Sequence, residues 1–139
     1  MEKTIIALQA KSQSGKTPTL KLLTKSLNQR YQNSRIVGIF PSKESISQDE
    51  LNSYLDKKGD IVIIFELENE KKIGIITYGD PTESLPTYLK VLIDEYNCEV
   101  IFCGCRTRGK TLNCIKEYQE KGYKIKIHKQ KLEYDESKQ

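Results

Sequence analysis

The sequence contains no tryptophan and a single histidine. That histidine, His128, lies on the polar side of an alternating segment, so we interpret it as a surface residue and not as a metal ligand or a catalytic base. The cysteines form no C-x-x-C pair and no Cys/His cluster with zinc-ligand spacing. They are Cys98, Cys103, Cys105 and Cys114. We therefore expect reduced, mostly buried thiols and no metal centre or disulfide built from them.

Long apolar runs are also missing. No segment stays apolar over the roughly 20 residues that a membrane-spanning helix needs. The first residues lack the apolar core and the cleavage site of a signal peptide. We therefore expect a cytoplasmic protein with no membrane partner. The net charge of +4 is modest and does not by itself indicate a nucleic-acid partner.

The most informative stretch lies near the N-terminus. An apolar run, Ile5 to Leu8, is followed by Ala10-x-x-x-x-Gly15-Lys16-Thr17 and then by a helical pattern. Small and polar loop residues let the backbone close around a phosphate, and the N–H groups that open the next helix favour an anion. The order of strand, loop and helix therefore predicts a phosphate-binding loop.

This stretch resembles the Walker A motif of the P-loop NTPase superfamily, with Ala10 where that motif usually has glycine. The resemblance implies that Lys16 contacts the β- and γ-phosphates during catalysis and that the Thr17 hydroxyl ligates Mg²⁺. The implied ligands are Mg²⁺ and either ATP or GTP. The absence of an Asn-Lys-x-Asp motif favours ATP. The residues expected to bind the nucleotide are Ser12, Gln13, Ser14, Gly15, Lys16 and Thr17.

Residues 104–111 repeat the same spacing. Gly104-x-x-x-x-Gly109-Lys110-Thr111 follows an apolar strand pattern and precedes a helical one. We favour the first loop as the phosphate cradle because the second carries two arginines, whose bulky side chains would crowd a wrapped phosphate. The sequence leaves open whether Lys16 or Lys110 is the one used.

The two arginines, Arg106 and Arg108, follow a predicted strand at the edge of the sheet where a nucleotide is expected. There they could stabilise charge on a transferring phosphoryl group or pair with a substrate phosphate. A solvated basic loop is the alternative. The polar loop Ser42–Ser45 also follows a strand, and it is either a contact for a second, phosphate-bearing substrate or a plain connection.

An acidic residue that ends an apolar strand predicts a second Mg²⁺ ligand. Asp80 ends the segment 73–80, which resembles the Walker B element, where a carboxylate holds the metal ion. Glu66 and Glu68, on the preceding strand, are competing candidates. The alternative for Asp80 is a turn role beside Pro81.

Hydrophobic periodicity predicts alternating strands and helices. The strands are expected at 4–9, 35–40, 61–68, 73–80, 99–103 and 123–128, and the helices at 16–32, 46–59, 82–97 and 111–121. This order predicts an α/β protein: a three-layer α/β/α sandwich with a mostly parallel sheet of about five to six strands, one antiparallel hairpin and right-handed crossovers, P-loop NTPase-like. We expect one nucleotide-binding domain over 1–130 and a polar C-terminal tail over 131–139.

Three functions follow from these patterns. The leading interpretation is a minimal P-loop protein that binds a nucleoside triphosphate with Mg²⁺ and hydrolyses it weakly. The second is a small-molecule or nucleotide kinase that transfers the γ-phosphoryl group. The third is a non-catalytic, nucleotide-dependent adaptor or nucleic-acid-binding module, although the basic segment 106–131 lacks the interleaved aromatic residues of a nucleic-acid interface.

Overall fold

The computed structural model describes residues 3–10, 16–42, 45–57, 59–78, 84–106 and 109–129. The strands are β1 (Thr4–Gln9), β2 (Arg35–Phe40), β3 (Val62–Glu66), β4 (Lys72–Ile76), β5 (Val100–Cys105) and β6 (Lys124–Lys129). The helices are α1 (Lys16–Arg30), α2 (Gln48–Lys57), α3 (Leu85–Lys90), which continues into a π-helical turn, η1 (Val91–Glu95), and α4 (Lys110–Glu117).

The six strands form one sheet in the order β2-β3-β4-β5-β1-β6. β1 pairs in parallel with β5 and β6, and β4 pairs in parallel with β5. β3 runs antiparallel to both of its neighbours, β2 and β4. The expected mostly parallel sheet of about six strands is therefore confirmed, and so is the hairpin between β3 and β4. The five parallel strands all end at one edge of the sheet, whereas β3 ends at the opposite edge.

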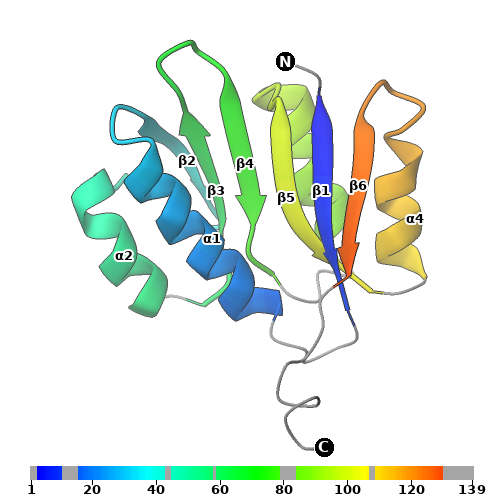
Figure 1. Ribbon diagram of the computed structural model, residues 1–139, viewed down its shortest axis with the longest axis horizontal. Coiled ribbons are helices and arrows are strands. Elements are labelled where there is room, and N and C mark those ends of the chain that lie inside the picture. Colours follow the sequence, from blue (N-terminus) through cyan, green and yellow to red (C-terminus); the bar gives the residue numbers. More distant parts are fainter. Residues whose placement is uncertain are drawn as a thin grey trace, which may run out of the picture.

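The helices lie on both faces of this sheet (Figure 1). α1 and α2 pack on one side, which we call the α1 face, and α3, η1 and α4 pack on the other, which we call the α4 face. The connection from β1 through α1 to β2 is right-handed, as expected. None of the helices in the described residues is long and apolar enough to cross a membrane.

The start of α2 follows directly from the sequence. The Glu50 carboxylate accepts hydrogen bonds from the Ser47 backbone N–H at 3.1 Å and the Ser47 hydroxyl at 3.0 Å. These bonds hold the pKa of Glu50 below its usual value. Gln48 and Asn28 then link α2 to α1, because the Asn28 amide donates to the Gln48 carbonyl at 3.0 Å and the Gln48 amide donates to Asn28 Oδ1 at 3.1 Å.

The third helix differs from the expectation. A serine before a helix often caps it, but the backbone of Ser84, at the N-cap position, is already helical and its side chain makes no capping bond. The helix also widens after Lys90, where the Tyr96 N–H bonds to the Val91 carbonyl, five residues back, at 3.2 Å. Periodicity cannot anticipate this turn, because the apolar positions of an α-helix and of a short π-helical segment are nearly the same.

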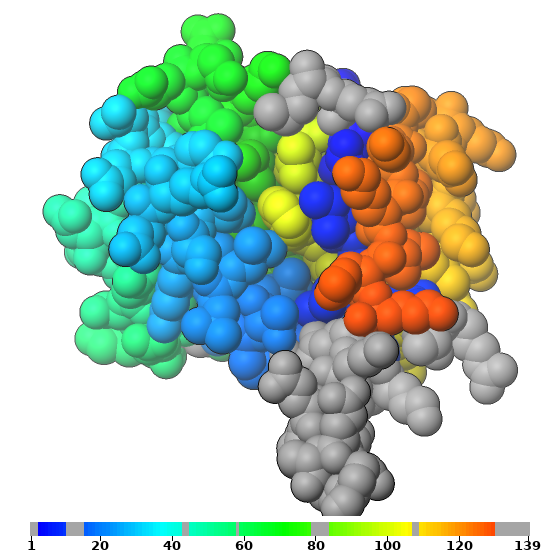
Figure 2. Space-filling model, viewed as in Figure 1, coloured from blue at the N-terminus to red at the C-terminus, as the bar shows by residue number. Residues whose placement is uncertain are grey.

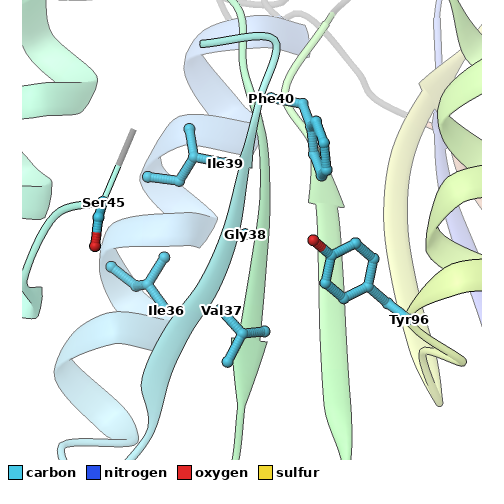
Figure 3. A pocket seen from close by; sticks show the side chains of 7 residues that line it. All are labelled: Ile36, Val37, Gly38, Ile39, Phe40, Ser45 and Tyr96. Carbon is cyan, nitrogen blue, oxygen red and sulfur yellow. The ribbon is translucent and has the colours of Figure 1, made fainter. Parts of the chain in front are cut away.

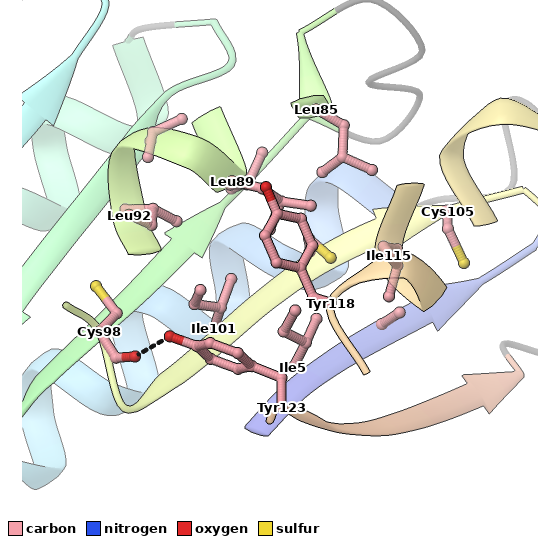
Figure 4. Close-up of a cluster of buried hydrophobic side chains, with 14 of the residues drawn as sticks. Ile5, Leu85, Leu89, Leu92, Cys98, Ile101, Cys105, Ile115, Tyr118 and Tyr123 are labelled. Atoms are coloured by element: carbon pink, nitrogen blue, oxygen red, sulfur yellow. Dashed lines mark hydrogen bonds between the residues drawn. The ribbon is translucent and has the colours of Figure 1, made fainter. Parts of the chain in front are cut away.

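The core on the α4 face joins β1, β3, β4 and β5 to α3, η1 and α4 (Figure 4). Leu89 and Leu92 from the helical segment and Ile115 from α4 are fully buried against Ile5 and Ile101 of the sheet. The Tyr123 hydroxyl closes the lower side of this core by donating to the Cys98 carbonyl at 2.8 Å. The α1 face has a second core, in which Leu51 and Leu55 of α2 cover β3.

Gly74 in β4 lets η1 approach the sheet. A Cβ built at Gly74 would lie 2.8 Å and 2.9 Å from the two terminal methyl carbons of Leu92 and 3.3 Å from Cys98 Sγ. Leu92 and Cys98 are both fully buried, so neither side chain can move aside into solvent. The packing of η1 on β4 therefore requires a residue without a side chain at position 74.

We predict that Gly74→Val lowers the free energy of unfolding by about 1–3 kcal/mol, the usual cost of overpacking a core. Urea denaturation followed by circular dichroism measures it. Gly59→Ala is the control, since a Cβ at Gly59 meets nothing within 4 Å, and it should change stability by less than about 0.5 kcal/mol. If Gly74→Val costs as much in a Leu92→Ala background as alone, Leu92 is not the constraint.

Candidate functional site

The candidate site lies where β1 and β5 end side by side. Leu8 pairs with Gly104 and Gln9 pairs with Cys105, and the Ala10 N–H extends this pairing by bonding to the Cys105 carbonyl at 3.1 Å. From these neighbouring ends the chain leaves in opposite directions, into α1 on one face and into α4 on the other. Such a reversal opens a crevice at the carboxyl ends of parallel strands, which is where α/β proteins bind their ligands.

Lys16, the first residue of α1, lies at this point and is only 2% exposed. Its ammonium donates to the Ala10 carbonyl at 2.8 Å and to the Cys105 carbonyl at 3.2 Å. One side chain therefore connects the end of β1, the start of α1 and the end of β5. A charge with this little solvent contact needs close acceptors, and these two carry only the partial charge of a peptide oxygen.

Thr17 follows in the first turn of α1 and is half-buried. The first turn of a helix presents backbone N–H groups without helical partners and favours negative charge. Lys16 and Thr17 therefore lie in the first turn of a helix at the carboxyl edge of the parallel strands. The remaining predicted nucleotide-binding residues, Ser12, Gln13, Ser14 and Gly15, lie outside the described residues.

The second GKT loop is built differently. Lys110, the first residue of α4, is exposed. The Thr111 hydroxyl, which is 2% exposed, accepts a hydrogen bond from the Arg106 N–H at 3.0 Å and so fastens the start of α4 to the end of β5. Gly109 has a φ of 101°, a backbone conformation that favours glycine. The contacts of Thr111 are those of a strand-to-helix turn, and the lysine here does not point back into the fold.

Arg106 directly follows Cys105, whose carbonyl accepts a hydrogen bond from the Lys16 ammonium. Its side chain is exposed, and its carbonyl lies 3.4 Å from the side-chain amide of Gln9. The predicted position of Arg106 at the carboxyl edge of the sheet, near Lys16, is therefore correct. Arg108 lies outside the described residues.

Two of the three candidate metal-binding carboxylates lie at the edge of the sheet opposite to Lys16. Glu66 ends β3, which runs antiparallel, and it pairs in register with Arg35 and Lys72, the first residues of β2 and β4. The Arg35 Nε donates to the Glu66 carboxylate at 2.7 Å, and this bond holds the pKa of Glu66 below its usual value. Glu68 lies in the adjoining turn. Neither can share a site with Lys16, because the length of the strands separates them.

Asp80, the remaining candidate, lies outside the described residues, whereas the preceding strand, β4, is described. β4 runs parallel to β1 and ends at the same edge, two strand positions away, which is about 10 Å. Within the described ranges, no group of three or more His, Cys, Asp or Glu side chains could hold a metal ion.

The polar loop at the end of β2 is not next to Lys16. β2 is separated from β1 by β3, β4 and β5, about 19 Å of sheet. The Ser42 hydroxyl is hydrogen bonded to the Tyr54 hydroxyl at 2.8 Å. Ser45 borders a pocket of about 300 Å³, formed with Ile36 to Phe40 and Tyr96 (Figure 3). The described lining of this pocket carries no charged side chain.

Sequence reasoning missed two contributions to the site. The acceptors of the Lys16 ammonium are the backbone carbonyls of Ala10 and Cys105. Every residue has a backbone carbonyl, so the residue type does not indicate which carbonyls accept this bond. Gln9 was not singled out either, although a glutamine that ends an apolar strand and is 7% exposed is a polar residue in need of a partner. Burial of Gln9 is a property of the sheet and cannot be read from its place in the chain.

The chain was compared with known proteins in three ways. It matches no protein-family model, no curated protein and no solved structure.

Three of the four cysteines, Cys98, Cys103 and Cys105, are buried, as expected. Burial raises the pKa of Cys105 to about 11, although the nearby Lys16 ammonium partly opposes the shift. Burial also raises the pKa of Cys98 to about 12 and raises that of Cys103 further still. Cys114 is only half-buried, and its pKa is raised as well.

We predict that a single thiol of the native protein reacts readily with a disulfide reagent at pH 8, and that it is Cys114. A pKa of about 11 leaves about one Cys105 in a thousand as the reactive thiolate at that pH. Raising the pH toward 11 increases the thiolate fraction of Cys105, but burial continues to block access. Cys114→Ser should remove the fast phase in absorbance-monitored modification, and Cys105→Ser should leave it unchanged. A fast phase that survives Cys114→Ser would contradict this assignment.

Proposed function

We propose that this protein binds a nucleoside triphosphate, ATP in preference to GTP, together with Mg²⁺ at the loop between β1 and α1, and hydrolyses it weakly. The observation that carries this proposal is the position of Lys16. A lysine within an A-x-x-x-x-G-K-T spacing is almost completely buried, at the carboxyl edge of a parallel sheet, where neighbouring strands send their helices to opposite faces.

The chemistry of this lysine suits a phosphate ligand. Its ammonium is held by the carbonyl oxygens of Ala10 and Cys105. The oxygens of a triphosphate carry full negative charges, so they attract the ammonium more strongly than the partial charge of a carbonyl oxygen does.

The architecture supports the same assignment at the level of the fold. A mostly parallel sheet with β1 in its interior, flanked by β5 and β6, and with helices on both faces, fits a P-loop NTPase-like fold. This part of the proposal is an analogy, since many functions share one fold. The residues at the β1–α1 junction carry the functional argument.

Mg²⁺ would be held by the Thr17 hydroxyl and the Asp80 carboxylate, which are oxygen ligands of the kind that this ion prefers. The bound ion would neutralise charge on the phosphate oxygens. Lys16 would orient the β- and γ-phosphates, and Arg106, with Arg108, would approach the γ-phosphate from the end of β5. Because Ser42 and Ser45 lie far along the sheet from Lys16, nothing in the described residues favours transfer to a second substrate over hydrolysis.

We predict that Lys16→Ala weakens MgATP binding severely, whereas Lys110→Ala binds with unchanged affinity. Loss of charge-assisted bonds to two phosphates removes about 3 kcal/mol, which is about a 100-fold weaker Kd. Isothermal titration calorimetry measures both variants. The expected asymmetry follows from the burial of Lys16 and the exposure of Lys110.

Folding must be checked first, because Lys16→Ala leaves two buried carbonyls without this donor and should cost about 1–3 kcal/mol of stability. A urea titration separates loss of folding from loss of binding. Weakened binding in Lys110→Ala with normal binding in Lys16→Ala would move the cradle to the second loop. Release of phosphate without any added acceptor would then distinguish a hydrolase from a kinase.

We further predict that Asp80→Asn removes the Mg²⁺-dependence of ATP affinity, since an amide is a poor ligand for a hard cation. The measurement compares ATP titrations with Mg²⁺ and with EDTA. Glu66→Gln is the matched control, because Glu66 lies at the opposite edge of the sheet and should leave the Mg²⁺ response intact. An intact response in Asp80→Asn would remove this carboxylate from the proposed metal site.

A further inference from the structure

One peptide group links the two GKT loops. It is the group between Cys105 and Arg106, at the end of β5. Its carbonyl oxygen accepts a hydrogen bond from the Lys16 ammonium at 3.2 Å, and its N–H donates to the Thr111 hydroxyl at 3.0 Å. Lys16 opens α1, and Thr111 lies in the first turn of α4. The starts of two helices on opposite faces of the sheet are therefore joined through a single peptide.

The next carbonyl of the chain, that of Arg106, is held from β1. The side-chain amide of Gln9, the last residue of β1, donates to it in a longer contact of 3.4 Å. The strands involved are neighbours, and Figure 2 shows atoms of β1 and β5 between α1 and β6. Both backbone polar groups of Arg106 are therefore bonded to side chains of other elements, one from β1 and one from α4.

The burial of the two side chains strengthens this arrangement. Thr111 and Gln9 are both buried, so little water competes with either of them for its partner. The side chain of Arg106, in contrast, is exposed at the carboxyl edge of the sheet. Its backbone is therefore fixed at the point where the side chain leaves the fold. Fixing the backbone removes conformations in which the guanidinium would point away from a ligand at this edge.

The shared peptide also sets the position of Arg106 relative to Lys16. The Lys16 ammonium bonds to the carbonyl of the same peptide whose nitrogen belongs to Arg106, so the arginine side chain starts beside the ammonium. A guanidinium offers a planar fork of N–H donors that matches the oxygens of a phosphate group. The two cationic side chains are therefore placed to contact one ligand from neighbouring elements.

We propose that Gln9 and Thr111 are positioning residues, which hold Arg106 so that its guanidinium contacts the γ-phosphate of a nucleotide bound by Lys16. This inference rests on the proposed function. Arginine stabilises the charge on the phosphoryl oxygens in the transition state of phosphoryl transfer. An interaction made mainly in that state raises kcat and leaves the binding of the nucleotide nearly unchanged. The second GKT loop then supports the reaction at the first loop through Thr111, without binding a phosphate of its own.

The test compares hydrolysis and binding in the full chain. Single-turnover release of phosphate measures kcat, and isothermal titration calorimetry measures the Kd of MgATP. Arg106→Ala should lower kcat at least about 100-fold. Thr111→Val keeps the shape of the side chain without its hydroxyl and should lower kcat about tenfold, since a displaced group loses part of its effect. Both variants should leave the Kd within about twofold of the wild-type value.

Three further variants control for loss of structure. Thr111→Ser keeps the hydroxyl and should retain kcat. Thr24→Val is the matched control, because Thr24 is fully buried in α1 and its hydroxyl donates to the Leu20 carbonyl at 2.8 Å. It loses a buried bond of the same kind away from Arg106 and should retain kcat. Gln9→Met removes the amide at similar size and should lower kcat, so it tests the proposal if Thr111→Val fails to fold in a urea titration.

A double variant separates positioning from general support of the fold. In the Arg106→Ala background, Thr111→Val should lower kcat no further, because its effect acts through the missing guanidinium. An equal loss in both backgrounds would overturn the proposal. A weaker Kd with unchanged kcat in Thr111→Val would also overturn it, by placing the effect on Lys16. Unchanged kcat in Arg106→Ala would overturn it and leave nucleotide binding standing, whereas wild-type protein that does not bind MgATP would refute the proposed function as well.

Discussion

The contact on which the candidate site depends is the one between the ammonium of Lys16 and the carbonyl oxygens of Ala10 and Cys105. It joins the end of β1, the start of α1 and the end of β5 at the place where the chain departs to opposite faces of the sheet. A buried ammonium is costly unless acceptors surround it, so the three segments hold one another in position through this side chain. Under the proposed function, a phosphate would compete for the same ammonium, and the loop would be held by one partner or the other.

The two GKT loops show how the same spacing can serve two structures. Both follow a strand and open a helix, but Lys16 points back into the fold whereas Lys110 is exposed. At the second loop, the Thr111 hydroxyl accepts the Arg106 N–H and completes a compact turn. The order of residues in the two loops is similar, and both preceding strands, β1 and β5, lie inside the sheet with a neighbour on each side. The difference is that the Lys16 ammonium reaches the Cys105 carbonyl at the end of the neighbouring strand, whereas Lys110 is exposed.

The reversed direction of β3 and the placement of the helices have consequences beyond the site. Because β3 is antiparallel, it carries Glu66 to the edge far from Lys16, where the carboxylate pairs with Arg35. Because the described helices over the α1 face cover only β2 to β5, the apolar residues Ile6 and Leu8 of β1 remain half-buried.

The sequence by itself determined the type and order of the elements, because alternating and helical apolar spacing, the Ser47–Glu50 capping box and the β3–β4 turn are local in origin. It also predicted that Lys16 and Arg106 would lie at one edge of the sheet, since parallel strands end together. Only the tertiary structure decided the order of strands, and with it the burial of Lys16, the exposure of Lys110 and the exclusion of Glu66 and Glu68 from the site. The physical reason is that burial and strand neighbours depend on contacts between residues far apart in the chain, such as that of Lys16 with Cys105, which no local pattern records.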